Sequence, residues 1–214
     1  MKEAARAVVF DLWNTLATWP EEAWAQVRPQ VAERLGLGLE EFEERWYVSE
    51  LSHLRETGPL ADVVARFGFP PEAAESILEL RRPLTKQGLT PVDGALETIS
   101  ELRRRGFRIG LITVCAEDVP ALWSETAFHG LFDAEVFSCS VGLRKPDARI
   151  YQLCCEQLGV EPGDAVFVGD GANDELAGAE RVGMTAVLLE GSPEEPDDWA
   201  GHRIRALPEL LELV

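Results

Sequence analysis

An apolar run, an acidic turn and a helical pattern follow one another in AVFVGDGANDELAGAERV, residues 165–182. The run 165–168 has the composition of a strand that is buried on both faces. Two glycines allow a tight turn around Asp170, and a helix is expected from Asn173 to Val182. A strand, a turn and a helix in this order are typical of a parallel α/β sheet, whose functional groups lie at the carboxyl ends of its strands.

The same alternation extends over most of the chain outside residues 19–87. Strands and helices in this order predict an α/β fold with a doubly wound, Rossmann-like parallel sheet. The proline-rich, acidic stretch Gly191–Asp198 is expected to be a surface loop. The expected strands are 7–11, 108–113, 134–137, 165–168 and 185–189, and the expected helices end at Gly106 or span 119–127, 146–158 and 173–182.

Residues 19–87 have a different pattern, which is helical throughout and shows no strand-like alternation. This stretch therefore predicts an inserted all-helical cap, with the α/β core formed by residues 1–18 and 88–214. Pro29 is expected to kink or divide the helical stretch before Gly36. Three further helices are expected at 40–55, 59–67 and 71–82.

The composition excludes several classes of protein. The 214 residues include 38 acidic and 20 basic side chains, giving a net charge of −18, which disfavours a nucleic-acid partner. No apolar run reaches the roughly 18 residues of a membrane span, so no membrane partner is expected. The N-terminal residues do not resemble a secretory leader, and none of the four cysteines forms a Cys-x-x-Cys pair. A cytoplasmic location with reduced thiols is expected.

Polar residues stand where the predicted strands end or a helix begins. Asp11 ends the first strand, Thr113 ends the second, Lys145 precedes a helix and Asp170 follows the fourth strand. The topology of a parallel sheet would bring these residues together. A carboxylate in this position can attack phosphorus or carbon, and a second carboxylate beside it needs a cation such as Mg²⁺ to offset the repulsion. Lysine and threonine side chains can bind the remaining oxygens of an anionic group.

Four segments together resemble the sequence motifs of the haloacid dehalogenase-like (HAD) superfamily. They are FDLWNTL at 10–16, Thr113, GLRKPDARIY at 142–151 and VGDGANDELAGA at 168–179. The resemblance implies a hydrolase with Asp11 as nucleophile and with Thr113 and Lys145 as groups that bind the phosphate or the intermediate. It also implies a Mg²⁺ site and a small anionic substrate, either a phosphorylated metabolite or a haloacid. The implied metal ligands are Asp11, the backbone carbonyl of Trp13, Asp170 and Asp174, and the residues expected to contact substrate are Trp13, Thr15 and Val114.

Trp13 departs from the phosphatase pattern of this superfamily, which has a second aspartate two residues after the nucleophile. An indole cannot protonate a leaving group, and the lost general acid is worth roughly 10²–10⁴-fold in rate. The interpretation that we rank first is a Mg²⁺-dependent phosphohydrolase or phosphotransferase for good leaving groups. The alternatives are a 2-haloacid dehalogenase, in which halide leaves without a proton, and a catalytically weak binding module. The pair Thr113-Val114 differs from the Ser-Asn pair expected of a dehalogenase.

Several other residues have two interpretations. Asn173 is expected to cap its helix rather than bind a ligand. Arginines of the insert are expected to form exposed salt bridges, the alternative being contact with a substrate carboxylate. The aromatic residues of the insert are expected to form the core of the cap, the alternative being a pocket lining. These residues are Arg28, Arg45 and Arg55, and Trp19, Trp24, Phe42 and Trp46. The sequence leaves the physiological substrate and the oligomeric state open.

Overall fold

The computed structural model describes residues 6–48, 52–193, 195–196 and 198–214. Its centre is a sheet of six parallel strands in the order β3-β2-β1-β4-β5-β6. All five expected strands are confirmed, and one short edge strand was not foreseen. The strands are β1 (Ala7–Phe10), β2 (Arg108–Thr113), β3 (Ala134–Phe137), β4 (Ala165–Gly169), β5 (Thr185–Leu189) and the unforeseen β6 (His202–Ile204).

The strand order places a switch point at the centre of the sheet. Strand β1 pairs with β2 on one side and with β4 on the other, and Phe10 aligns with both Leu111 and Val168. From β1 the chain continues outward to β2 and β3, whereas β4, β5 and β6 follow in the opposite direction. In such a sheet a crevice opens where the order reverses, outside the carboxyl ends of the strands. That position lies at the ends of β1 and β4.

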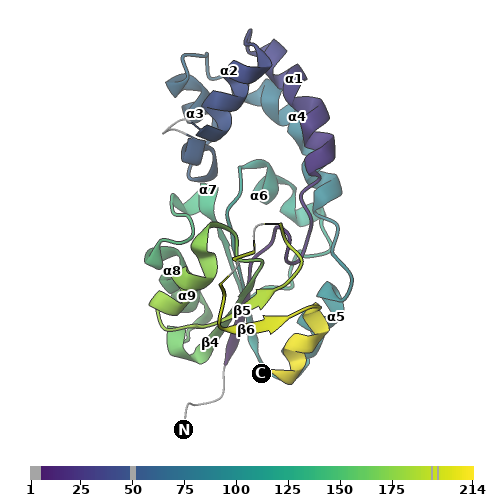
Figure 1. Ribbon diagram of the computed structural model, residues 1–214, viewed down its shortest axis with the longest axis vertical. Helices are drawn as coiled ribbons and strands as arrows, with labels where there is room; N and C mark the ends of the chain where they lie inside the picture. The colour runs from purple at the N-terminus through teal and green to yellow at the C-terminus, as the bar shows by residue number, and fades with distance from the viewer. Residues whose placement is uncertain (1–5, 49–51, 194, 197) are drawn as a thin grey trace.

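Helices cover both faces of this sheet (Figure 1). Alternate side chains of β1 point to opposite faces, so Val8 and Phe10 join one apolar cluster while Val9 joins the other. The first cluster packs against α5 (Ala95–Arg104) and the 3₁₀ segment η6 (Leu207–Glu212). The second packs against α8 (Ala148–Leu158) and α9 (Glu175–Arg181). Shorter elements are α6 (Asp118–Leu122), α7 (Ser138–Val141), η3 (Trp123–Glu125), η4 (Pro162–Asp164) and η5 (Ala172–Asp174).

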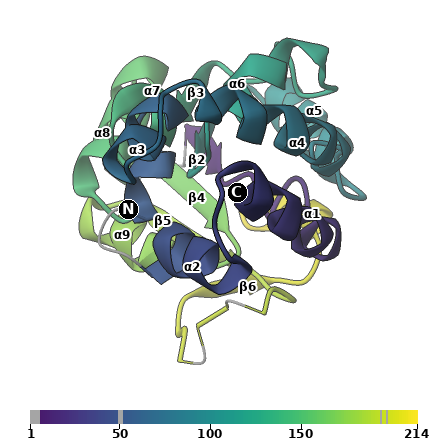
Figure 2. The ribbon, with the colours of Figure 1, turned by 90° about the horizontal axis from the view of Figure 1, so that it is seen from above.

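The segment between β1 and α5 forms a helical part that lies over the carboxyl edge of the sheet (Figures 1 and 2). It has its own apolar cluster, in which Trp24, Phe42 and Ile77 are buried. This separate cluster supports the proposed division into a core and a cap, and we use those two words below. The cap elements are α1 (Glu21–Arg34), α2 (Leu39–Glu43), η1 (Glu44–Val48), η2 (Ser52–Glu56), α3 (Leu60–Arg66) and α4 (Ala73–Gly88).

The cap helices differ in their bounds from the sequence prediction. A kink or a division was expected at Pro29, and helix α1 continues across this residue, so the division was wrong. Helix α4 likewise continues past Pro83 to Gly88. Each proline removes one helical hydrogen bond, but Trp24 and Val31 of α1 are buried in the cluster shared with α4, and this packing offsets the loss.

Residues 40–55 do not form the single helix that was expected. The described part consists of the short helix α2, a π-helical turn at η1 and a 3₁₀ segment at η2, while residues 49–51 lie outside the described residues. In the core, the helix expected at 119–127 is α6 followed by η3. Among the described helices, none has the length and apolar character that a membrane span requires. All four cysteines are free, and Cys154 and Cys155 are buried on α8 as expected.

Candidate active site

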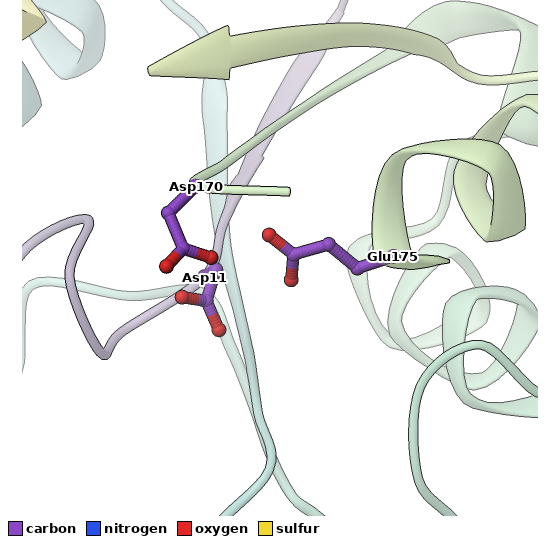
Figure 3. A group of neighbouring side chains, drawn as sticks. All are labelled: Asp11, Asp170 and Glu175. Carbon is purple, nitrogen blue, oxygen red and sulfur yellow. The ribbon is translucent and has the colours of Figure 1, made fainter. Parts of the chain in front are cut away.

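Three buried carboxylates meet at the switch point of the sheet. Asp11 directly follows β1, and its N–H donates to the carbonyl of Val168 on β4 at 2.8 Å. Asp170 directly follows β4, and Glu175 is the first residue of α9. Figure 3 shows the three carboxyl groups turned toward one another, and oxygen atoms of all three lie within 4.8 Å of each other. The two acids that the sequence analysis placed at strand ends therefore meet, together with one that it did not name.

Lys145 supplies the positive charge inside this acidic cluster. It lies in the loop before α8, and its side chain is 4% exposed. Its ammonium donates to Asp11 Oδ1 and to Glu175 Oε2. The other oxygen of Asp11 accepts from Thr15 Oγ1 at 3.2 Å. Asp11 is thus held on both oxygens while it still borders the cavity described below.

Glu175 is the member of the carboxylate cluster that the sequence did not indicate. Its Oε1 accepts from the Gly171 N–H at 3.1 Å and lies so close to Gly169 that a Cβ there would be 2.0 Å away. Glycine at position 169 is therefore required for this carboxylate to enter the site. The string GDGANDE contains the residue, but nothing in the string distinguishes its role from that of Asp174.

Asp174, one of the expected metal ligands, is not among the carboxylates that the structure brings together. Asn173 and Asp174 both adopt left-handed backbone conformations, with φ of 54° and 55°. Residues other than glycine adopt this conformation infrequently, although Asn and Asp adopt it more often than most. After these two residues helix α9 begins with Glu175 buried, whereas Asp174 is exposed and is not part of the carboxylate cluster. The two left-handed residues thus place Glu175, and not Asp174, next to Asp11 and Asp170.

One backbone donor and one side-chain donor fix the carboxylate of Asp170. Its Oδ1 accepts from the Ala172 N–H at 3.1 Å, and its Oδ2 accepts from Ser192 Oγ at 2.8 Å. Ser192 belongs to the stretch 191–198 that was expected to be only a surface loop, and residues 194 and 197 of it lie outside the described residues. The loop after β5 therefore contributes a side chain to the site, which the composition of that loop did not indicate.

Burial and mutual repulsion change the acidity of the cluster. Burial has the largest effect on Glu175 and raises its pKa to about 8, although Lys145 acts in the opposite direction. Burial likewise raises the pKa of Asp11, with Lys145 opposing and Asp170 adding to the rise. Burial lowers the pKa of Lys145, but Asp11 and Glu175 more than offset this and hold it above its usual value. The cluster therefore has more negative charge than its single ammonium can balance.

The remaining predicted residues take different positions around the cluster. Thr113 is completely buried at the end of β2, and its Oγ1 has no hydrogen-bond partner among the described residues. Trp13 and Val114 line the cavity, as expected for residues that contact a substrate, whereas Thr15 is buried and contacts Asp11. Asn173 does not cap α9, because its Oδ1 instead accepts from Arg144 at 3.3 Å.

A cavity of about 280 Å³ lies between the acidic cluster and the cap. Asp11, Asp170, Glu175 and Lys145 form its core wall. The cap contributes aromatic and guanidinium groups to the wall. The alternative interpretation, a pocket lining, therefore applies to Trp19, Trp24, Trp46 and Arg55. Phe42 is buried in the apolar cluster of the cap, as expected. The residues of the cap wall include Trp19, Glu21, Trp24, Trp46, Tyr47, Arg55, Glu56 and Arg81.

A family model described as haloacid dehalogenase-like hydrolase matches residues 5–183. The chain belongs to this family of hydrolases. It is 33% identical over 202 residues to phosphatase MT3486 of Mycobacterium tuberculosis (strain CDC 1551 / Oshkosh), covering 89% of this chain and 90% of that protein. It is 25% identical over 224 residues to (S)-2-haloacid dehalogenase 4A of Burkholderia cepacia, covering 100% and 96%. A HAD phosphatase from Thermococcus onnurineus has a similar solved structure, with a TM-score of 0.74, 27% identity and 97% of each chain covered.

The donor set of this HAD-like hydrolase fits a hard divalent cation. The cluster offers carboxylate oxygens from Asp11, Asp170 and Glu175 within 4.8 Å of one another, and neither cysteine nor histidine belongs to it. Magnesium prefers oxygen ligands of this kind, whereas softer metals prefer sulfur and imidazole. The excess negative charge at the cluster points in the same direction, since a divalent cation would balance it.

Proposed function

We propose that this HAD-like hydrolase is a Mg²⁺-dependent phosphohydrolase in which Asp11 attacks the phosphorus of a small phosphorylated substrate. The observation that supports this most is the buried cluster of three carboxylates and one ammonium that opens onto the cavity. Asp11, Asp170 and Glu175 would hold the ion, together with the Trp13 backbone carbonyl. The ion would balance the charge of the carboxylates and of the phosphoryl oxygens.

The residues of the chain have separate roles in the proposed reaction. An oxygen of Asp11 forms a bond to phosphorus while the bond between phosphorus and the leaving oxygen breaks, which leaves an aspartyl phosphate. Lys145 and Thr15 orient the Asp11 carboxylate, and the Lys145 ammonium lies next to the charge that develops on the phosphoryl group. The hydroxyl of Thr113 is buried without a partner beside the cavity-lining Val114, and in the proposed reaction it would donate to a phosphoryl oxygen. Water then hydrolyses the acyl phosphate.

Trp13 restricts the substrates of this proposed reaction. It lines the cavity two residues after Asp11, and its ring centre lies 5.3 Å from that of Trp19 at an interplanar angle of 80°. An indole in contact with another indole has no proton to give to a leaving alkoxide. Aryl and acyl phosphates, whose oxygens leave as stable anions, should therefore be hydrolysed much faster than alkyl phosphates.

The decisive experiment measures phosphate release from phenyl phosphate and acetyl phosphate, with Mg²⁺ and with a chelator. We expect release that depends on Mg²⁺, and Asp11→Asn should lower it by about four to six orders of magnitude, as loss of a covalent nucleophile does. The Asp174→Asn variant is the matched control, because Asp174 is exposed and lies outside the acidic cluster. Unchanged activity in Asp11→Asn would show that this carboxylate is not the nucleophile.

Trp13 also favours a second candidate function, the hydrolysis of 2-haloacids. Halide leaves without a proton, and one relative of the chain is a 2-haloacid dehalogenase. The three-carboxylate cluster argues against it, because the attack of Asp11 on carbon needs no cation to balance a phosphoryl group. Halide release from 2-chloropropionate in the presence of a chelator would favour the dehalogenase. Tight binding of Mg²⁺ and phosphate without turnover of either class would favour a binding module.

A further inference from the structure

The cap side of the cavity carries a guanidinium that is held in one orientation. Arg81 of α4 donates from Nε to Asp118 Oδ2 at 3.0 Å and from Nη2 to Asp118 Oδ1 at 3.4 Å. Thr85 Oγ1 donates to the same Oδ2 at 2.6 Å. Asp118 is the first residue of α6, and its side chain is fully buried. A two-point contact between a cap helix and a core helix thus fixes the plane of the Arg81 side chain.

One edge of this guanidinium stays available. Among the residues that the structure describes, none accepts a hydrogen bond from Arg81 Nη1. Nη1 is also absent from the fully buried polar atoms that lack a partner, so it reaches accessible space. Arg81 is 8% exposed as a residue, and the cavity is the space that it borders. A fixed guanidinium that lines the cavity from the side of the cap thus has one nitrogen, Nη1, with accessible surface and no partner among the described residues.

Aromatic rings connect this donor to the reacting end of the cavity. The Arg81 guanidinium carbon lies 5.0 Å from the ring centre of Trp19 and 5.2 Å from that of Trp24. Trp19 in turn contacts Trp13, which is two residues from Asp11. The wall from Asp11 to Arg81 is thus formed by flat apolar rings and ends in a polar group. A ligand that follows this wall would be flat and apolar in the middle and would carry an oxygen at its far end.

We propose that Arg81 is a specificity residue, whose Nη1 donates to an oxygen acceptor on the leaving group of an aryl phosphate. This inference rests on the proposed function, and it selects the aryl class from the good leaving groups considered there. Two properties of the site favour this class, and Trp13 contributes to both. A phenol leaves without a general acid because its pKa is about 10, and the indole wall provides aromatic contacts for its ring. The acceptor is a carboxylate or a carbonyl oxygen remote from the phosphate.

The alternative is that Arg81 only fastens the cap to the core through Asp118. In that case the loss of Arg81 would affect all substrates equally, since the fastening is common to them. A specificity residue would instead affect only substrates with an acceptor. Removing Arg81 alone would leave the buried Asp118 carboxylate unpaired, which is strongly destabilising, so the test replaces both partners.

The experiment compares kcat/KM of the wild type and of the double variant Arg81→Gln, Asp118→Asn on matched esters. The esters are phenyl phosphate and its 3- and 4-substituted carboxy and acetyl derivatives. Taking the ratio of the two enzymes for each ester cancels the intrinsic reactivity of the leaving group. We expect the double variant to lose about 10–100-fold on at least one acceptor ester and less than about threefold on phenyl phosphate. The carboxy and acetyl arms distinguish a charged from a neutral acceptor.

The control is Arg82→Gln, because Arg82 is adjacent on α4 but pairs with Glu75 at 2.7 Å and is absent from the cavity wall. Equal losses on all esters in the double variant would overturn the inference. Calorimetric binding of 4-hydroxybenzoate, 4-hydroxyacetophenone and phenol gives a second readout that does not depend on turnover. Tighter binding of an acceptor-bearing phenol by the wild type than by the double variant supports the inference even if the proposed phosphatase reaction fails.

Discussion

The core wall and the cap wall of the cavity differ in how their charges are balanced. The core wall concentrates buried carboxylates around one ammonium, so that Glu175 and Asp11 have raised pKa values and a divalent cation would relieve the repulsion. The cap wall pairs each of its two guanidinium groups with a carboxylate, Arg81 with Asp118 and Arg55 with Glu56, and the Arg81 group lies over indole rings, so these charges are already balanced. An unbalanced wall attracts a cation and an anionic reaction centre, whereas a balanced wall discriminates by shape and hydrogen bonds.

This difference separates the proposed chemistry from the proposed selectivity. Changes to the core wall should alter metal dependence and rate for every substrate. Changes to the cap wall should alter the ranking of substrates and leave the metal dependence unchanged. Trp13 lies at the junction, because it belongs to the core loop after β1 while its ring contacts the cap residue Trp19. Variants on each side of this junction can therefore test whether the core wall determines the chemistry and the cap wall the selectivity.

Apart from the loss of the nucleophile Asp11 itself, the largest effect on the core wall is expected from Glu175→Gln. This variant keeps the size of the side chain but removes one negative charge from the proposed metal site. We expect the Mg²⁺ concentration for half-maximal activity to rise by about 10–100-fold, the range typical of lost support at a metal site. Its neighbour Asp174→Asn should stay within about twofold of the wild type. A larger effect of Asp174→Asn than of Glu175→Gln would restore the assignment made from the sequence.

A gain of activity is expected at the junction of the two walls. The Trp13→Asp variant would introduce a carboxyl group two residues after the nucleophile, where it can protonate an alkoxide. We expect hydrolysis of alkyl phosphates to rise by at least about tenfold, a fraction of the full benefit of a general acid. Aryl phosphates, which need no such proton, should not gain. Trp13→Asn is the matched control, because it creates the same space and polarity without a proton donor.

The core wall was largely predictable from the sequence. Apolar runs of four to six residues marked five strands, and in a parallel sheet the residues after β1 and β4 must lie on one edge. Asp11 and Asp170 were found for that reason. The edge strand β6 (HRI) escaped because two of its three residues are exposed and it contains no apolar run. Glu175 escaped because a helix start cannot be located to one residue when the two residues before it, Asn173 and Asp174, adopt left-handed conformations that the sequence does not mark.

The cap wall was less predictable, because its function depends on contacts between distant segments. Helix α4 was expected to end near residue 82, and its continuation past Pro83 depends on packing that periodicity does not reveal. Arg81 meets Asp118 across 37 positions of sequence, in a pairing that joins two separately packed regions. Aromatic spacing indicated a cap core, which is correct for Phe42, but it could not show that Trp19 and Trp24 also border a cavity.

The smallest effect is expected at a half-buried acid that belongs to neither wall of the cavity. Asp147 is the N-cap of α8, two residues after Lys145, and its side chain accepts from the Arg149 N–H at 2.9 Å. Asp147→Ala should lower the free energy of unfolding by about 1 kcal/mol at pH 7, which is typical of a lost N-cap. Asp147→Asn should lose less, since an amide oxygen can still accept from that N–H. Urea unfolding of the three proteins measures both differences.

The pH dependence of that difference follows from the direction of the pKa shift. The hydrogen bonds from Arg149, the largest cause, lower the pKa of Asp147 to about 2 from an ordinary value of 3.8. A carboxyl group whose pKa is lower in the folded state binds protons more readily when unfolded, so its contribution is complete above about pH 4 and declines as the pH falls toward 2. The gap between wild type and Asp147→Ala should therefore be constant from pH 7 to pH 5 and narrower at pH 3. A gap that widened on acidification would show that this carboxylate, like Glu175, is destabilised by its surroundings.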